Sequence, residues 1–237
     1  MEKDIFGKAL LDFQSGQYSE DIITWTNISD KDKLPLPYLF RAFSKMPKIE
    51  QKALQLVEGS ALDVGCGSGS HSLYLQKKGI EVKAIDSSKG AVEVAKRRGV
   101  INIECISLLS YSEKQFDTIL LLMNGTGIFQ EMQQVTTYLK HLKSLLKPNG
   151  QILIDSSDIK YMYGFEEEVE VEIGFENNGR YYGELDYYLS YKNEEATPMK
   201  WLYLDFGTLK LACKTVGLQC KKVEDGEHYD YLAKISI

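Results

Sequence analysis

Two short segments of the chain carry the residue types that can bind a nucleoside. The first is Ala61–Ser70, an apolar run that leads into three closely spaced glycines, ALDVGCGSGS. Glycines let the backbone bend sharply and let a ligand approach without meeting a Cβ, while the amides that open a following helix offer donors. The second is Val82–Asp86, an apolar run ending on an acid about 20 residues after the first glycine, where a carboxylate can accept both hydroxyls of a ribose. Together they predict a nucleoside-binding crevice.

Two cofactor classes compete for such a crevice. A dinucleotide fingerprint is G-x-G-x-x-G/A, but here the sixth position is Ser70 and Gly69 comes one place early. Asp63, two residues before the first glycine, would repel a pyrophosphate and suits a cationic ligand. The pattern therefore favours a cationic nucleoside over a nicotinamide dinucleotide, which stays as the alternative.

The elements that position these segments alternate between strand and helix. From 58 to 155 the pattern predicts strands 60–64, 81–86, 102–106, 116–123 and 151–155 and helices 70–78, 88–98 and 132–146. In the last helix Val135, Leu139, Leu142 and Leu146 form one apolar stripe. Alternation of this kind predicts parallel strands joined by crossover helices.

The segments on either side of this core have different sequence patterns. Residues 1–57 are predicted to be a helical cap with breaks at Gly16 and the Pro35/Pro37 pair. In 157–200, residues 168–173 alternate with period two, and with 180–191 they predict an antiparallel hairpin insertion. Residues 201–237 predict a helix near 205–216, with Gly217 as its carboxyl cap, and strands near 219–223 and 229–237. We therefore expect one domain, with 58–156 as its cofactor-binding core.

Composition narrows the class of protein. The 237 residues are 43% hydrophobic and 26% charged, which favours a folded domain, and no apolar run reaches the roughly 20 residues of a membrane span. The amino terminus has no secretion signal, so we expect a cytoplasmic protein that does not bind membranes. The net charge of -6 disfavours nucleic acid as a partner. The four cysteines lack CxxC pairing and ligand spacing, so neither disulfides nor a metal site is expected.

The segment Leu62–Gly69 resembles the first motif of the class I S-adenosylmethionine-dependent methyltransferases. The resemblance covers about 53 to 156 firmly and the carboxyl-terminal helix and strands more loosely. It implies an α/β, Rossmann-like, doubly wound sheet of seven mostly parallel strands with the last one antiparallel. It also implies S-adenosyl-L-methionine as the cofactor.

The resemblance also assigns cofactor contacts. The acid at Asp63 would lie near the methionyl amino group, Asp86 would hold the ribose hydroxyls, and Ser87 would lie against the adenine. The family's adenine-binding acid after the third strand is replaced by Ser107. The expected cofactor-binding set is Asp63, Gly65, Cys66, Gly67, Gly69, Asp86, Ser87, Ser107, Leu108 and Met123. Segment 34–41 is predicted to be a lid that adds Tyr38 and Arg41, with Arg41 paired to the methionyl carboxylate.

Methyl transfer from a sulfonium is an in-line displacement, so the protein mainly aligns the reactants and excludes water. Ligands sit beyond the carboxyl ends of parallel strands, which makes Asn124, Tyr161 and Tyr163 the candidate catalytic residues. His71 is interpreted as a hydrogen-bonding residue at a helix start. The sequence after strand 116–123 is not the N/D-P-P-Y/F of enzymes that methylate nucleic-acid adenines.

The combined hypothesis is an S-adenosylmethionine-dependent methyltransferase acting on an unidentified small molecule. Two alternatives remain at this point: a nicotinamide-dependent oxidoreductase, and a noncatalytic cofactor-binding or assembly protein. An exposed edge of the predicted hairpin would make a homodimer feasible.

Overall fold

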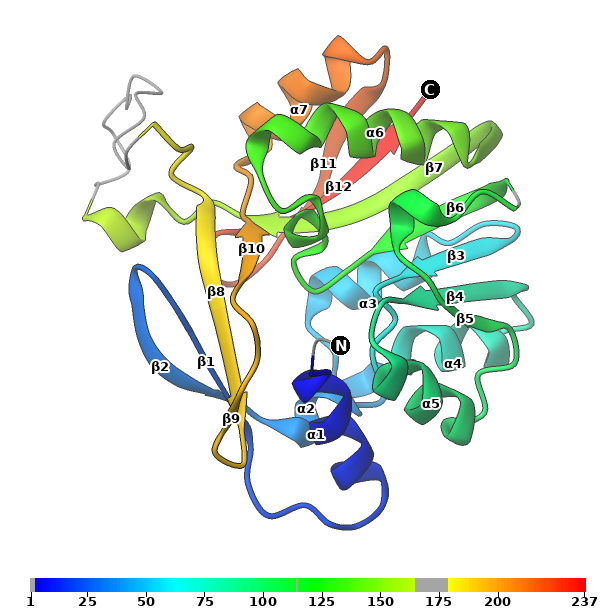
Figure 1. The fold of residues 1–237 in the computed structure, drawn as a ribbon. Helices are drawn as coiled ribbons and strands as arrows, with labels where there is room; N and C mark the ends of the chain where they lie inside the picture. Colours follow the sequence, from blue (N-terminus) through cyan, green and yellow to red (C-terminus); the bar gives the residue numbers. More distant parts are fainter. Residues whose placement is uncertain (1–2, 114, 165–178) are drawn as a thin grey trace.

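A computed structural model describes residues 3–113, 115–164 and 179–237, and its centre is a seven-stranded sheet (Figure 1). The strand order is β11-β12-β7-β6-β3-β4-β5. Neighbours from β7 to β5 are parallel, whereas β12 is antiparallel to both β7 and β11. The predicted doubly wound sheet with an antiparallel last strand is confirmed. Its strands are β3 (Ala61–Val64), β4 (Val82–Asp86), β5 (Ile103–Cys105), β6 (Phe116–Leu121), β7 (Leu146–Ser157), β11 (Gln219–Asp225) and β12 (Asp230–Ser236).

Helices cover both faces of this sheet. On one face lie α3 (Lys48–Gln55), α4 (Ser70–Lys77) and α5 (Lys89–Arg98), and on the other α6 (Val135–Ser144) and α7 (Phe206–Thr215). Successive side chains of the central strands point to opposite faces of the sheet. Leu120 and Leu153 pack in one core cluster, and Ile119 and Ile152 pack in the other. Strands buried on both faces explain why 119–123 and 152–154 are continuous apolar runs. Short 3-10 turns occupy η1 (Phe43–Lys45), η2 (Leu108–Ser110), η3 (Gly125–Phe129), η4 (Met132–Gln134) and η5 (Lys160–Tyr163).

A second, antiparallel sheet overturns part of the predicted helical cap. After α1 (Ile5–Gln14), residues 22–34 form a hairpin instead of helix, and α2 (Leu36–Leu39) follows. Ile22–Thr26 is rich in β-branched residues, and Ile22 is fully buried against α1 and β8. The sheet has the order β10-β8-β1-β2, with β9 paired to β8. Its strands are β1 (Ile22–Thr26), β2 (Ser29–Leu34), β8 (Glu184–Tyr191), β9 (Glu194–Glu195) and β10 (Met199–Leu202).

The predicted hairpin insertion is described only in its second half. Residues 168–173 lie outside the described residues, while β8 falls within the predicted strand 180–191. The described neighbours of β8 are β1 and β10, with Thr24 opposite Leu189 and Trp201 opposite Leu185. The amino-terminal segment and the insertion therefore form one sheet beside the carboxyl edge of the core (Figure 1).

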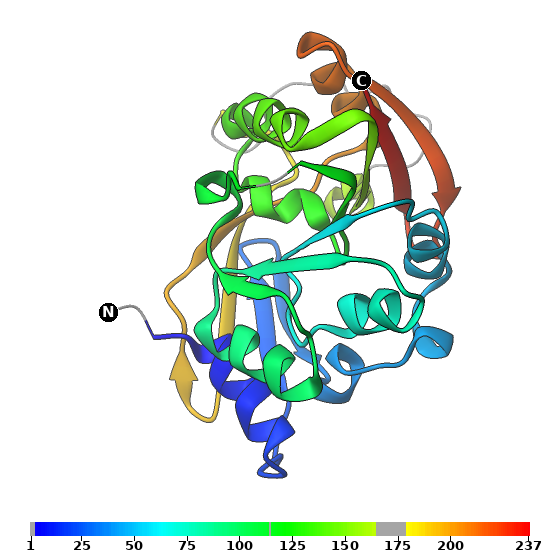
Figure 2. The ribbon, with the colours of Figure 1, turned by 90° about the vertical axis from the view of Figure 1, so that its right-hand side faces the viewer.

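The amino-terminal helix is tied to the core through α5, and Figures 1 and 2 both place α1 beside it. Asp4 caps α1 by accepting from Gly7, and its carboxylate also accepts from Ser88 and Gly90 at the start of α5. A Cβ on Gly90 would lie 2.5 Å from the backbone of Gly7, so both helices need glycine at this crossing.

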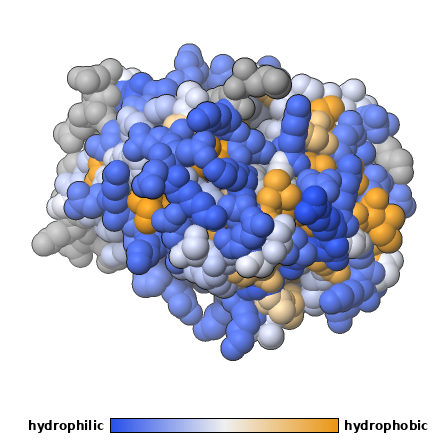
Figure 3. All heavy atoms as spheres, turned by 60° about the horizontal axis from the view of Figure 1, so that its bottom comes forward, coloured by the Kyte–Doolittle hydropathy of each residue, from blue (hydrophilic) through white to orange (hydrophobic). Residues whose placement is uncertain are grey.

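The surface is mainly polar where Figure 3 brings the lower side of Figure 1 forward, and apolar side chains there are scattered. Within the described part of the chain, no helix is long and apolar enough to cross a membrane.

Candidate active site

In the glycine loop between β3 and α4, one glycine is required by packing and another faces open space. Gly65, Gly67 and Gly69 all have positive φ, between 53° and 83°, a region that L side chains rarely adopt. A Cβ on Gly69 would lie 2.6 Å from the Val100 side chain, so this glycine is required by packing. A Cβ on Gly67 would meet no atom within 4 Å. Gly67 therefore leaves open space for a ligand that closely approaches the backbone.

Asp86 ends β4 and joins this loop to the next turn. Its Oδ2 accepts from the Gly67 amide at 2.8 Å and its Oδ1 from the Ser88 amide at 2.8 Å. Burial raises the pKa of Asp86, although both amide hydrogen bonds oppose that shift. Each carboxylate oxygen accepts one amide and has capacity for a second donor, which is what a ribose diol requires.

Asp63 is buried and already has a hydrogen-bond partner within the protein. Its side chain is 1% exposed, and its Oδ2 accepts from the Ser72 hydroxyl at 2.5 Å. This bond ties β3 to the first turn of α4 and fixes the angle at which the helix leaves the loop. Contact of Asp63 with a methionyl amino group remains a prediction.

The segment 36–41, which lies within the predicted lid 34–41, is attached to the glycine loop; closure over a cofactor stays a prediction. The Leu39 carbonyl accepts from the hydroxyls of Ser68 at 2.5 Å and Ser70 at 3.1 Å. Arg98, at the end of α5, donates to the Ser68 carbonyl at 2.6 Å and to the Phe40 carbonyl at 3.4 Å. Arg98 belongs to no sequence motif, yet its guanidinium links segment 36–41 to the loop.

Arg41 points to an internal partner instead of an open site. Its guanidinium pairs with Glu50 of α3, donates to the Tyr38 carbonyl at 2.6 Å, and lies 3.8 Å from the centre of the Tyr38 ring. The other Glu50 oxygen is 2.8 Å from Nε2 of His71 in α4. The arginine predicted to hold the methionyl carboxylate therefore already has a carboxylate partner. His71 does form the helix-start hydrogen bond predicted for it.

Within the buried cluster of Arg41, Glu50 and His71, each group shifts the pKa values of its neighbours. Burial would raise the pKa of Glu50, but the hydrogen bond and charge of His71 and the charge of Arg41 lower it overall. Burial would lower the pKa of His71, but Glu50 and the charge of Asp63 raise it above 6.5. Both shifts favour the charged forms, so the cluster links lid, α3 and α4 by ion pairing.

The other predicted cofactor residues differ in accessibility. Ser87 is exposed, and its carbonyl accepts from Cys105. Ser107 hydrogen-bonds with Ser110 at 2.8 Å, and Leu108 is buried in the main core. Cys66 is buried and burial raises the pKa of its thiol, so it lines the loop as an inert packing group.

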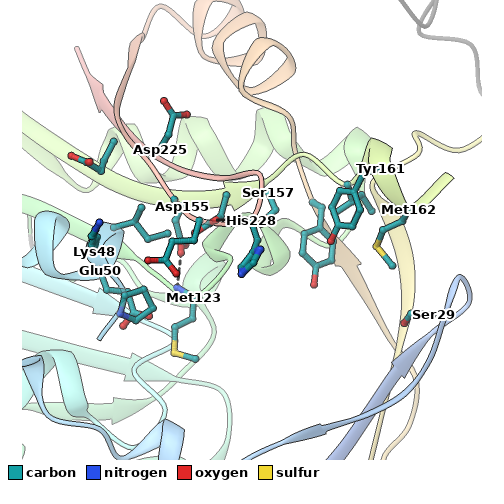
Figure 4. Close-up of a pocket in the computed structure, with 18 of the residues that line it drawn as sticks. Ser29, Lys48, Glu50, Met123, Asp155, Ser157, Tyr161, Met162, Asp225 and His228 are labelled. Atoms are coloured by element: carbon teal, nitrogen blue, oxygen red, sulfur yellow. Dashed lines mark hydrogen bonds between the residues drawn. The ribbon is translucent and has the colours of Figure 1, made fainter. Parts of the chain in front are cut away.

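A pocket of about 650 Å³ opens where β6 and β7 end, between the core and the second sheet (Figure 4). Met123 follows β6, and Asp155 and Ser157 come from the end of β7. Tyr38 of the lid and Glu50 of the buried cluster also line it. This pocket is linked to the glycine loop in two ways: Glu50 contacts His71 in α4, and Leu39, the neighbour of Tyr38, accepts from the Ser68 and Ser70 hydroxyls of the loop.

Asp155 is, like Glu50, a buried carboxylate in the pocket, with 5% of its surface exposed. Its oxygens accept from the amides of Met123 at 3.1 Å and Gly125 at 3.0 Å, the first of which is drawn in Figure 4. Those bonds hold Met123 and Asn124 at positive φ, 66° and 61°, an uncommon conformation for residues other than glycine. Burial raises the pKa of Asp155 to about 6 despite the amides, and the charge of Glu50 contributes.

The three predicted catalytic residues occupy different places. Tyr161 lines the pocket, is 48% exposed, and stacks on Tyr229 with ring centres 4.8 Å apart. Tyr163 donates to the Tyr182 carbonyl at 2.8 Å and is not among the residues that line the pocket. Asn124 accepts from Ser156 at 3.3 Å, also away from the pocket lining. Only Tyr161 therefore lines the pocket, and a catalytic role remains a prediction for all three.

Sequence reasoning missed Asp155, Glu50 and the turn between β11 and β12 that contributes Asp230 and His228. A signal existed for Asp155, because it ends the predicted strand 151–155 as Asp86 ends 81–86, and parallel strands bring such residues to one edge of the sheet. No comparable signal marked Glu50, whose partners lie on other elements.

Comparisons with known proteins agree with this geometry. Residues 61–150 match a family described as a methyltransferase domain. A SAM-dependent methyltransferase from Bacteroides fragilis, solved in complex with S-adenosyl-L-homocysteine, is 39% identical, with a TM-score of 0.88 over 99% of this chain and 95% of that one. The chain belongs to the class I S-adenosylmethionine-dependent methyltransferases. Members of this family use S-adenosylmethionine, which removes the nicotinamide alternative.

More distant relatives of this methyltransferase are informative mainly about the fold. The ubiquinone biosynthesis O-methyltransferase of Histophilus somni is 30% identical over 125 residues, which are 48% of this chain and 51% of that protein. The chain thus spans about half the length of this curated relative. The CcbJ methyltransferase from Streptomyces caelestis has a TM-score of 0.61 at 14% identity, over 81% of this chain and 90% of that one, and shows the fold alone.

Proposed function

We propose that this protein transfers the methyl group of S-adenosylmethionine to a small-molecule acceptor that binds in the pocket beside β6 and β7. The observation that carries the proposal is the link between two sites: a glycine loop with an accessible backbone at Gly67, and a 650 Å³ pocket whose lining residue Glu50 contacts His71 in the helix that follows the loop. The relative from Bacteroides fragilis, which binds S-adenosyl-L-homocysteine, supports the cofactor assignment.

The residues of the crevice fit the cofactor. Asp86 offers carboxylate oxygens already aimed by the Gly67 and Ser88 amides, and would hold the ribose hydroxyls. Asp63 supplies buried negative charge beside the loop, which suits a cation and opposes a pyrophosphate. When bound, S-adenosylmethionine supplies an electrophilic methyl group on a sulfonium sulfur. The protein would hold the acceptor in line with that methyl group and exclude water, with Met123 and Tyr38 as walls.

Titration calorimetry with S-adenosyl-L-homocysteine tests the cofactor site. We expect saturable binding, and Asp86→Ala should weaken it by about 1–3 kcal/mol because ribose donors lose their acceptor. Asp32→Ala is the control, since Asp32 is exposed on β2 and, among the described residues, its carboxylate accepts only from the Lys33 amide. Unchanged affinity in Asp86→Ala would show that the ribose lies elsewhere.

The open space at Gly67 gives a second, independent test. Gly67→Val should abolish binding of S-adenosyl-L-homocysteine, because a branched side chain would fill the ligand's space. Gly79→Val is the matched control: Gly79 also has positive φ and an open Cβ direction, but it follows α4 on the exposed surface. The two variants share the backbone strain and differ in position relative to the crevice.

Turnover separates an enzyme from a noncatalytic binding protein. Protein that binds the cofactor is incubated with methyl-labelled S-adenosylmethionine and a pool of small metabolites, and transfer of label is measured. Labelled product supports the enzyme. Tight cofactor binding without labelled product would favour the noncatalytic alternative.

A further inference from the structure

The pocket that adjoins the cofactor crevice has a strongly negative lining. Six carboxylates line it, against one lysine, Lys48, and no arginine among the described lining residues: Glu50, Asp155, Glu224, Asp225, Glu227 and Asp230. Glu50 is balanced by Arg41 and His71, and Asp225 by Lys222 at 2.7 Å. Asp155 and Asp230 form no ion pair among the described residues. The remaining charge is available to a ligand.

Aromatic side chains stand among these carboxylates. Tyr38, Tyr161 and Tyr203 all line the pocket. The hydroxyl of Tyr38 lies in the field of three of the acids: burial raises its pKa most, Glu50, Asp155 and Asp230 raise it further, and Arg41 opposes them. Tyrosine faces attract cations, and carboxylates add to that attraction where water is partly excluded. The same surroundings repel an anionic acceptor such as a phenolate.

Asp155 is the carboxylate of the pocket that is placed to accept a proton from a ligand. It is 95% buried at the end of β7, its two oxygens are aimed by the Met123 and Gly125 amides, and it sits on the side where the pocket meets the β6 loop (Figure 4). The amides of Met123, Asn124 and Gly125 all act on it, and its two oxygens, with about four lone-pair sites between them, have capacity left for a ligand N–H. Its pKa of about 6 lets it exist as a carboxylate at neutral pH and still receive a proton.

From this arrangement we infer that the acceptor is an amine, bound as its ammonium ion between the tyrosines, and that Asp155 takes its proton. The inference rests on the proposed methyl transfer. The ammonium N–H gives its proton to the Asp155 carboxylate, which leaves a neutral amine with a free lone pair. That lone pair forms the N–C bond as the S–C bond breaks, and the S–C electron pair stays on sulfur. The products are the N-methylammonium ion and S-adenosyl-L-homocysteine, and Asp155 passes its proton to solvent.

The test measures binding to the complex with S-adenosyl-L-homocysteine, so it needs no knowledge of the natural acceptor. Benzylamine, 2-phenylethylamine and tyramine are each compared with the matching alcohol at pH 7.5 by calorimetry. We expect at least one amine to bind tenfold or more tighter than its alcohol. If none binds tighter than its alcohol, the amine inference is overturned. Failure of S-adenosyl-L-homocysteine to bind, seen in the first titration, would instead overturn the proposed function.

Asp155→Asn tests the role of the carboxylate, because the variant keeps the side-chain shape and loses the charge. We expect the preference for the amine to fall to threefold or less, with affinity for S-adenosyl-L-homocysteine unchanged. Asp32→Asn is the control with the same change on the exposed β2 strand, and should keep the preference. Retention of the full preference in Asp155→Asn would refute the assignment to Asp155.

A pH titration adds a readout that a purely structural role would not change. The preference for the amine should decline as the pH falls through about 6, where Asp155 gains its proton, and the decline should be absent in Asp155→Asn. Glu50 of α3, Tyr38 of α2, and Asp230 and His228 of the β11–β12 region also line this pocket. His228→Asn is therefore included. If it removes the decline and Asp155→Asn does not, the titrating group is His228 and the proposal for Asp155 is wrong.

Discussion

Replacing Asp155 by asparagine should change how stability depends on pH. Burial raises the pKa of Asp155 from 3.8 to about 6. Each pKa unit is worth about 1.4 kcal/mol, so the ionised side chain costs about 3 kcal/mol of folding free energy at neutral pH. The folded protein holds this proton more tightly than the unfolded chain does. Stability from this group is therefore fully present below pH 3.8 and is lost as the pH rises through 6.

The assay is urea unfolding of wild type and Asp155→Asn at several pH values between 4.5 and 7.5. Relative to the variant, the wild type should lose about 2 kcal/mol of unfolding free energy across that range. Asparagine turns its NH₂ group toward one of the two amides that Asp155 binds, and this adds a cost that is the same at every pH. The cost cancels when the pH dependence is compared. Parallel curves for the two proteins would refute the argument.

Three further predictions concern the loop and the buried cluster. Gly69→Ala should lower the free energy of unfolding by about 1–3 kcal/mol, because positive φ and a Cβ 2.6 Å from Val100 both oppose a side chain, and thermal or urea unfolding measures it. Glu50→Ala should cost about 3–5 kcal/mol, since it leaves the Arg41 guanidinium buried without a carboxylate; a loss under 1 kcal/mol would mean that water reaches the site. His71 should stay protonated above pH 6.5 in an NMR titration. Its stabilising effect should be present below that pH and be lost as the pH rises through its raised pKa.

The core of the fold was predictable because its signals are local. The glycine loop, the acid ending Val82–Asp86 and the apolar stripe of helix 135–144 each depend on residues close together in the sequence. The seven-stranded, mostly parallel sheet with an antiparallel last strand followed from the family resemblance, and the structure confirms it. The amino-terminal cap was misread because no local pattern states that Ile22–Thr26 will pair with β8, more than half the chain away. Strand pairing at that separation is decided by burial of both strands against a third element, here α1.

The chemistry of the site divides in the same way. The sequence alone predicted where a cationic nucleoside would bind, because glycines and acids at fixed positions on a β-α turn impose one backbone geometry. Only the tertiary structure decided that Arg41 is paired with Glu50, that Tyr163 lies away from the pocket lining, and that Asp155 is buried in an acidic pocket. A side chain's charge state and partners depend on which groups surround it from distant elements. Residue identity is fixed by the sequence, but the field around each residue is produced by the packing of the whole chain.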